Sequence, residues 1–110
     1  MKKAWVSSTL LVLLAACGSS DLDTITFEGA RFTGDYRVDR SDRAAFVARG
    51  GPASVSLDGA RQAAKFQAVQ HCISYLGTSD VAWVNGPDVA DAALVVEDNE
   101  VVLSGRCREP

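Results

Sequence analysis

Three cysteines and one histidine are the side chains of this 110-residue chain best suited to nucleophilic, redox or metal chemistry: Cys17, Cys72, Cys107 and His71. A histidine base needs a nucleophile to activate and a partner to orient it, and no GxSxG or other recognisable serine setting is present. His71 and Cys72 are adjacent, so on a helix their side chains would diverge by about 100° and could not easily ligate one metal. We therefore expect a structural or surface histidine, no metal, no cofactor and no enzyme activity.

Cys17 follows a segment that has the features of an export signal. Lys2 and Lys3 give it a positive start, and residues 4–16 form an apolar run interrupted only by three hydroxyl side chains. This run is shorter than the roughly 20 residues that a membrane-spanning helix needs. A positive start, a short apolar core and small residues at its end predict a cleaved signal peptide.

The sequence LAAC at residues 14–17 resembles the lipobox of bacterial lipoproteins. The resemblance implies that residues 1–16 are removed, that the Cys17 thiol carries diacylglycerol, and that the new amino terminus is acylated. The acyl chains would anchor the protein in a lipid bilayer, since each buried methylene contributes about 0.8 kcal/mol. Residues 17–23 would be a lipidated tether, and Gly18 in place of aspartate favours the outer membrane. The alternative is a plain signal peptide with a chance cysteine near its end.

Cys72 and Cys107 form the even pair that is left after Cys17 is assigned to lipid. In an exported protein such a pair predicts a disulfide. Closing a loop of 35 residues could stabilise the fold by about 3–4 kcal/mol on the chain-entropy relation. A redox or metal pair is the alternative, but there is no CxxC spacing. The expected role is structural.

The charges of the mature chain argue against a polyanionic partner. Without Lys2 and Lys3, nine of the eleven basic side chains remain against fourteen acidic ones, a formal balance of −5. Arginines between residues 31 and 49 alternate with aspartates, so they form a mixed-charge face rather than a basic patch. We therefore expect no nucleic-acid binding and no broad attraction to an anionic lipid surface.

Alternating apolar and polar residues predict three strands in the first half of the domain. They are expected at residues 24–32, 35–40 and 43–49. Thr33-Gly34 and Ser41-Asp42 are suitable turns between them, and Gly29 could bend or bulge the first strand. The GGP sequence at residues 50–52 is expected to end this antiparallel meander.

A helix is predicted at about residues 58–76, with Ser56 or Asp58 as its cap and Gly77 as its stop. Two kinds of side chain line different faces of it. Large apolar residues with helical spacing form one face, next to Cys72, and alanines form another that would allow a close approach. The large residues are Phe66, Val69, Ile73 and Leu76, and the alanines are Ala60, Ala64 and Ala68.

Three further strands are expected after the helix. VAWVN is one, NGPD at residues 85–88 is a turn, and residues 93–97 and 101–106 form a hairpin through Asp98-Asn99. The predicted order is therefore β-β-β-α-β-β-β. We expect residues 24–110 to be a single α+β domain, with an antiparallel sheet of about five or six strands packed on one helix.

Trp83 and Tyr75 are the best candidates for a partner-binding surface, because aromatic side chains often anchor interfaces. A small domain also needs aromatic residues in its core, and for Trp83 we favour the core over an exposed binding surface. The acidic groups at residues 87–91 and 97–100 lack the ligand pattern of an EF-hand loop. They are expected to be solvated.

Residues 59–88, together with GRC at residues 105–107, resemble small bacterial outer-membrane lipoproteins of uncharacterised function. The resemblance favours pairing Cys72 with Cys107 and implies no activity. From the sequence we expect a periplasm-facing, non-catalytic binding or scaffold module of the cell envelope, with an envelope protein as its partner. The alternative is an inhibitor or chaperone-like module for a periplasmic enzyme or an exported substrate.

Overall fold

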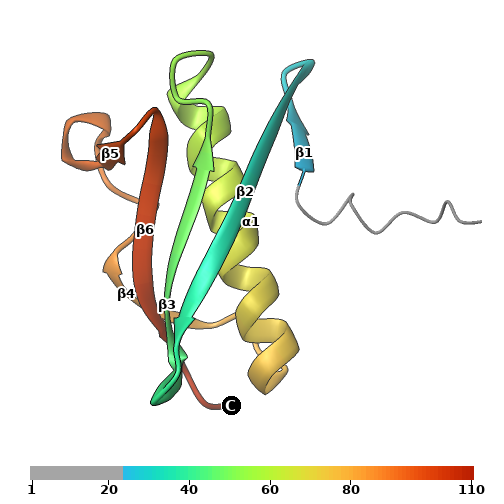
Figure 1. Cartoon of the computed structure of the whole chain (residues 1–110), viewed down its shortest axis with the longest axis vertical. Helices are drawn as coiled ribbons and strands as arrows, with labels where there is room; N and C mark the ends of the chain where they lie inside the picture. The colour runs from blue at the N-terminus through green and yellow to red at the C-terminus, as the bar shows by residue number, and fades with distance from the viewer. Residues whose placement is uncertain (1–23) are drawn as a thin grey trace, which may run out of the picture.

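The computed structural model of the chain describes residues 24–110 (Figure 1). The predicted signal peptide, residues 1–16, and the tether with Cys17 lie outside the described residues. The elements follow the predicted order, and the predicted α+β class is confirmed. Their bounds are β1 (Thr24–Phe27), β2 (Ala30–Asp39), β3 (Asp42–Gly51), α1 (Leu57–Leu76), β4 (Val81–Asn85), a short 3₁₀ helix (Asp91–Ala93), β5 (Val95–Glu97) and β6 (Glu100–Cys107).

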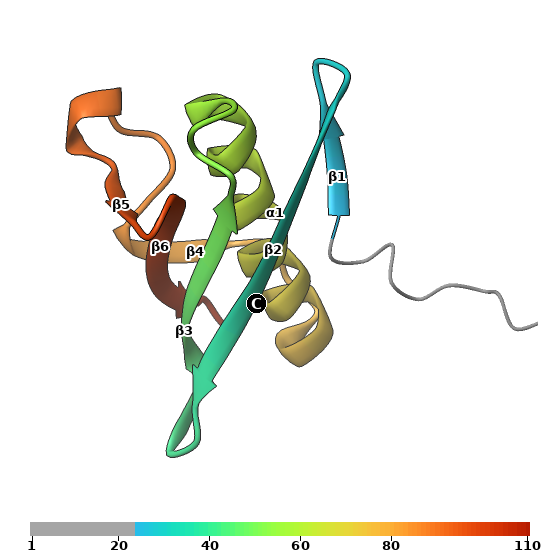
Figure 2. The ribbon, with the colours of Figure 1, turned by 45° about the horizontal axis from the view of Figure 1, so that its top comes forward.

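The strands form one antiparallel sheet in the order β1-β2-β3-β6-β4, and β5 also pairs with β6. The last strand of the chain therefore lies inside the sheet, between β3 on one side and β4 and β5 on the other. Helix α1 crosses one face of the sheet, as Figures 1 and 2 show from two directions. Within residues 24–110 the other face of the sheet has no helix against it.

The first hairpin differs from the prediction in the position of its turn. Residues 24–32 do not form one strand, because the chain reverses at Glu28 and Gly29, which both have positive φ angles of 50° and 83°. Two successive residues in this conformation make a two-residue hairpin turn whose twist matches that of the flanking strands. The expected turn at Thr33-Gly34 is wrong, since both residues lie inside β2.

Gly34 and Gly50 permit close packing rather than chain reversal. A Cβ atom on Gly34 would lie 2.4 Å from the Arg49 carbonyl oxygen, and one on Gly50 would lie 2.4 Å from the Ala64 amide nitrogen. Gly50 is part of β3, so the predicted break at residues 50–52 comes too early, and the strand ends at Gly51. A glycine within a strand often marks such a close backbone approach.

Helix α1 begins and ends with the predicted caps. The Ser56 hydroxyl accepts a hydrogen bond from the Gly59 amide at 3.0 Å, which satisfies one of the donors left free at a helix start. At the other end, Gly77 adopts φ = 76°, and its amide donates to the Ile73 carbonyl at 2.9 Å. The helix is therefore one residue longer than predicted, starting at Leu57.

Of the two faces foreseen for α1, the alanine face is the buried one. It packs on the sheet around β3, where Gly50 allows the helix backbone to come near. Ile73, on the face of large apolar residues, is exposed. The buried residues of the helix are Gly59, Ala60, Ala63, Ala64, Gln67, Ala68, His71 and Cys72.

The core between helix and sheet has two clusters of buried side chains. One is built around Phe46 and Cys72, and the other around Val101 and Leu103 of β6. Phe32 is fully buried next to the start of the helix, where a Cβ on Gly59 would lie 2.3 Å from its ring. The core is thus thin, formed by small helix residues against larger strand residues.

Arg61 attaches the segment after β4 to the helix. Its guanidinium donates to the carbonyl oxygens of Pro87 and Val89, each at 3.0 Å, and pairs with the carboxylates of Asp91 and Asp58. The Arg61 side chain is 14% exposed, so these contacts are partly shielded from water. No sequence signal pointed to this role for Arg61.

Candidate functional site

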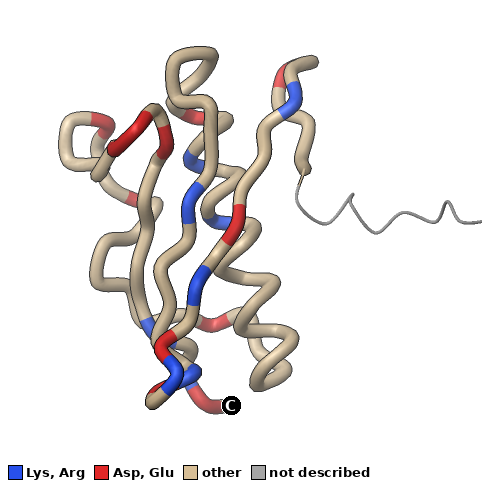
Figure 3. Tube along the Cα trace, in the orientation of Figure 1, with Lys and Arg blue, Asp and Glu red and all other residues tan. Residues whose placement is uncertain are grey.

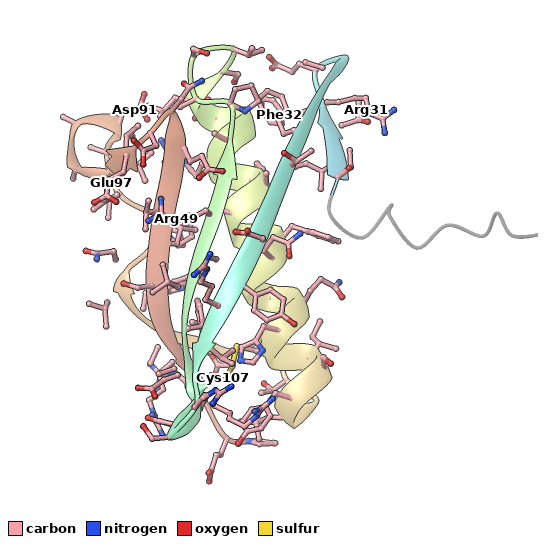
Figure 4. All side chains as sticks on the ribbon, viewed as in Figure 1. Arg31, Phe32, Arg49, Asp91, Glu97 and Cys107 are labelled. Atoms are coloured by element: carbon pink, nitrogen blue, oxygen red, sulfur yellow. A yellow bond between two sulfur atoms is a disulfide. The ribbon has the colours of Figure 1, made fainter. Side chains whose placement is uncertain are left out.

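Cys72 of α1 and Cys107 of β6 are joined as a disulfide, with an S–S distance of 2.07 Å and a Cα–Cα distance of 5.3 Å. The two residues are 0% and 4% exposed. The disulfide thus lies inside the core and ties the last part of the helix to the end of β6 (Figure 4). A sulfur pair without solvent access suits a structural cross-link better than redox exchange.

His71 is buried and held by the sheet. Its Nε2 lies 2.8 Å from the carbonyl oxygen of Arg43, and because a carbonyl can only accept, Nε2 carries the proton and donates. The ring is 5% exposed and lies near the Phe46 ring, at a centroid distance of 5.9 Å. These neighbours supply neither a nucleophile nor an orienting carboxylate, so His71 has a structural environment.

Two exposed tyrosines lie against this histidine. The Tyr75 ring is parallel to the His71 ring within 8° at a centroid distance of 5.8 Å, and the Tyr36 ring lies 4.9 Å from the same ring. Tyr36 is 39% exposed and Tyr75 is 44% exposed. Tyr36, His71 and Tyr75, which we call the tyrosine surface, therefore form an aromatic patch with a fixed base and two accessible rings.

An unpaired strand edge borders the tyrosine surface. Strand β1 pairs with β2 only from Ala30 to Thr33, so the rest of β2 has β3 on one side. Within residues 24–110, no strand pairs with the other side of residues 34–38. Figures 1 and 2 both show β1 beside only one half of β2. Tyr36 lies at the middle of this free stretch.

Trp83 belongs to the core packing. Its ring meets the Phe46 ring edge-on, at 5.8 Å between centroids and 87° between planes, and it packs against both core clusters. Phe46 also contacts His71, so this one phenylalanine has Trp83 and His71 as neighbours. Trp83 thus packs against the core, as the sequence favoured. Of the two residues predicted for a partner-binding surface, Tyr75 is the exposed one. The neighbouring Val84 is 78% exposed.

Charged residues of both signs lie along β2 and β3 and near β5, as Figure 3 shows. Arg49 lies 3.3 Å from Glu97 and 3.8 Å from Glu100, at the position that Figure 4 labels beside β6. A shallow hollow here is lined by Asp35, Arg37, Val47, Arg49, Asp98 and Glu100. Because positive and negative groups alternate, the hollow does not favour an ion of either sign.

The acidic tip at residues 97–100 is attached to the chain before the helix. The Asn99 side chain accepts from the Ser54 amide at 2.7 Å and donates to the Ser54 hydroxyl at 3.1 Å. The Asn99 carbonyl also accepts from the Ala53 amide at 2.8 Å. Over the described residues, no three histidine, cysteine or acidic side chains are grouped as metal ligands.

Over the same range, no helix combines the length and apolar character needed to cross a bilayer. Comparison with known proteins found no matching family model, no matching curated protein and no matching solved structure. Tyr36 was not predicted as a site residue; the sequence indicated only that it belongs to a strand, expected at residues 35–40.

Proposed function

We propose that this chain is a lipid-anchored, non-catalytic binding module of the bacterial cell envelope, and that its tyrosine surface contacts a protein partner. The single observation that carries the proposal is the accessibility of Tyr36 and Tyr75 on a rigid base. Tyrosine rings provide a large amphipathic contact area at a low cost in conformational entropy. Here His71, which donates to a backbone carbonyl, holds both rings in place.

Three sequence features support the location in this proposal. They are the LAAC sequence before residue 18, the positive and apolar segment that precedes it, and the even cysteine pair. The Cys72–Cys107 disulfide agrees with an oxidising compartment such as the periplasm. An outer-membrane anchor through acylated Cys17, with the domain facing the periplasm, is the arrangement that these features favour.

The binding proposal is tested by photo-crosslinking in cells. A photoreactive phenylalanine analogue is placed at Tyr75 in the full chain, and the matched control carries it at Val84, which is more exposed but has no part in the tyrosine surface. We expect one discrete adduct with an envelope protein from position 75 and none from position 84. Equal adducts from both positions, or none from position 75, would contradict the proposal. A broad range of exported chains captured from position 75 would favour the chaperone-like alternative.

A further inference from the structure

Within residues 24–110, part of the β2 edge has no strand partner. The described part of β1, from Thr24 onward, pairs with β2 up to Thr33, and a bulge between Val38 and Asp39 precedes the β2–β3 turn. Among the described residues, the unpaired window is therefore residues 34–38, with Tyr36 at its centre. An unpaired strand edge exposes backbone donors and acceptors that another strand can satisfy.

The orientation of these backbone groups follows from the first hairpin. Glu28 and Gly29 form a two-residue turn, so the flanking residues Phe27 and Ala30 are the pair that exchanges both of its hydrogen bonds. Backbone groups alternate along a strand, so the even-numbered residues of β2 point toward the β1 side. Gly34, Tyr36 and Val38 accordingly direct their N–H and C=O groups at the open edge.

The two side chains that flank Tyr36 in the window carry opposite charges. Asp35 precedes it and Arg37 follows it, and both are exposed on the open face of the sheet. Within the described part of the chain, neither of them takes part in a salt bridge. If the same strand is placed antiparallel beside it with Tyr36 opposite Tyr36, each Asp35 lies directly opposite an Arg37.

We propose that a second copy of this chain binds at the β2 edge, in an antiparallel pairing with a two-fold axis at Tyr36. Gly34 then pairs with Val38 of the second copy, and the two sheets become one continuous sheet. The two Asp35–Arg37 pairs fall at positions without ladder hydrogen bonds, where facing side chains are closest. This is the reciprocal contact that a symmetric dimer requires.

The charges select this occupant over an unrelated strand. Charged side chains on an edge strand discourage pairing with an uncharged partner, which would leave both groups without a counter-ion. A strand of the same sequence neutralises both at once. The two copies of Tyr36 also lie opposite each other on the helix side of the sheet, while Tyr75, on α1, lies outside the strand pairing.

The dimer goes beyond the proposed function and does not depend on it, because its contacts all lie within the folded domain. A window of five residues forms a small interface, for which we expect weak association in dilute solution. If Cys17 is acylated, as the proposed function holds, confinement to a membrane raises the effective concentration and favours the dimer.

Cysteine trapping in the full chain tests the register. Asp35→Cys and Arg37→Cys chains with different tags are produced singly and together, and a disulfide is induced by a mild oxidant. In the proposed register positions 35 and 37 are directly opposite, with Cα atoms about 4.5 Å apart, within disulfide range. Two copies of position 35, or two of position 37, are diagonal neighbours about 7–8 Å apart and beyond that range.

We expect the mixed pair to give a disulfide dimer at a yield at least about five-fold above either chain alone. The reason is that only the mixed pair brings two cysteines within the Cα–Cα distance that a disulfide spans. The parent chain gives the background from Cys17, and mass spectrometry identifies the joined peptides. A mixed yield no higher than the single yields, or no dimer at all, would overturn the proposal. Both substituted side chains are exposed, so folding is not expected to change.

Charge reversal gives a second test in chains that also carry Tyr36→Cys, the one position that faces its own copy. Asp35→Arg alone or Arg37→Asp alone places like charges opposite each other, so each should dimerise about ten-fold less than the Tyr36→Cys parent. Mixing these two chains restores opposite charges and should restore the dimer. A misfolded variant would not be rescued in this way. Absence of rescue, with each variant folded by circular dichroism, would refute the pairing.

Discussion

Removal of the Cys72–Cys107 disulfide should cost this domain a large part of its stability. The two cysteines are 35 residues apart, and closing a loop of this length contributes about 3–4 kcal/mol on the chain-entropy relation. A domain of this size has a total free energy of unfolding of about 5–10 kcal/mol. At about 4–8 °C per kcal/mol, the Cys72→Ala/Cys107→Ala variant should therefore melt about 12–30 °C below the parent.

The assay is urea unfolding of the oxidised parent and of the double variant, followed by circular dichroism. Because the released chain expands in the unfolded state, we expect a lower midpoint together with a steeper dependence on urea. A reductant should lower the midpoint of the parent toward that of the variant and leave the variant unchanged. A loss of less than about 1 kcal/mol in the variant would refute the role assigned to the disulfide.

Three further predictions concern single side chains. Gly50→Ala would place a methyl group against the Ala64 backbone and should destabilise the domain by about 1–3 kcal/mol, measured by thermal unfolding; an unchanged melting temperature would contradict the close packing. Arg61→Ala removes the donors to the segment that follows β4 and should cost about 1–3 kcal/mol and speed proteolytic cleavage between residues 86 and 93, whereas equal cleavage of parent and variant would show that Arg61 does not hold it. The Ser41 hydroxyl and amide donate to Asp39 at 2.8 and 2.9 Å and lower the pKa of that carboxyl. Ser41→Ala should therefore raise the pKa of Asp39, measured by NMR titration. The small stabilisation that the lowered pKa gives, which is present above the unfolded pKa and lost as pH falls through the lowered one, should shrink in this variant.

The sequence predicted those parts of the fold that depend on local chemistry. The caps of α1 follow from Ser56 and Gly77, whose side-chain oxygen and left-handed conformation act within one helical turn. The strand at residues 81–85 likewise follows from its own residue types. These features need no knowledge of what the rest of the chain does.

Other features of the fold depend on contacts between distant segments. Gly34 is a residue type typical of turns, yet it lies in β2. A glycine is needed there because the Arg49 carbonyl oxygen would lie 2.4 Å from a Cβ atom at this position. The burial of the alanine face of α1, rather than the face with Ile73, depends on the same closeness of helix and sheet. Nothing in the local pattern of residues 100–107 shows that β6 lies inside the sheet, between β3 and β4.

The candidate site was predicted only in part for the same reason. Tyr75 was recognised from its residue type, but its neighbour Tyr36 comes from a strand 39 positions earlier, and His71 joins the two. The register of β1 on β2 also depends on the position of the first turn, which was predicted wrongly. The opposite charges on the two sides of Tyr36 are visible in the sequence. They indicate a pairing with a second copy only once residues 34–38 are known to lack a strand partner within the described part of the chain.

The proposed membrane anchor depends most directly on the chemical state of Cys17. Its decisive measurement is the intact mass of the protein extracted with detergent from cell envelopes, followed by fragmentation of its first peptide. We predict a chain that starts at Cys17, lacks the first 16 residues, and carries diacylglycerol on the thiol and an acyl group on the amino terminus. A chain cut at another residue, or one that starts at Cys17 with a free thiol, would contradict it.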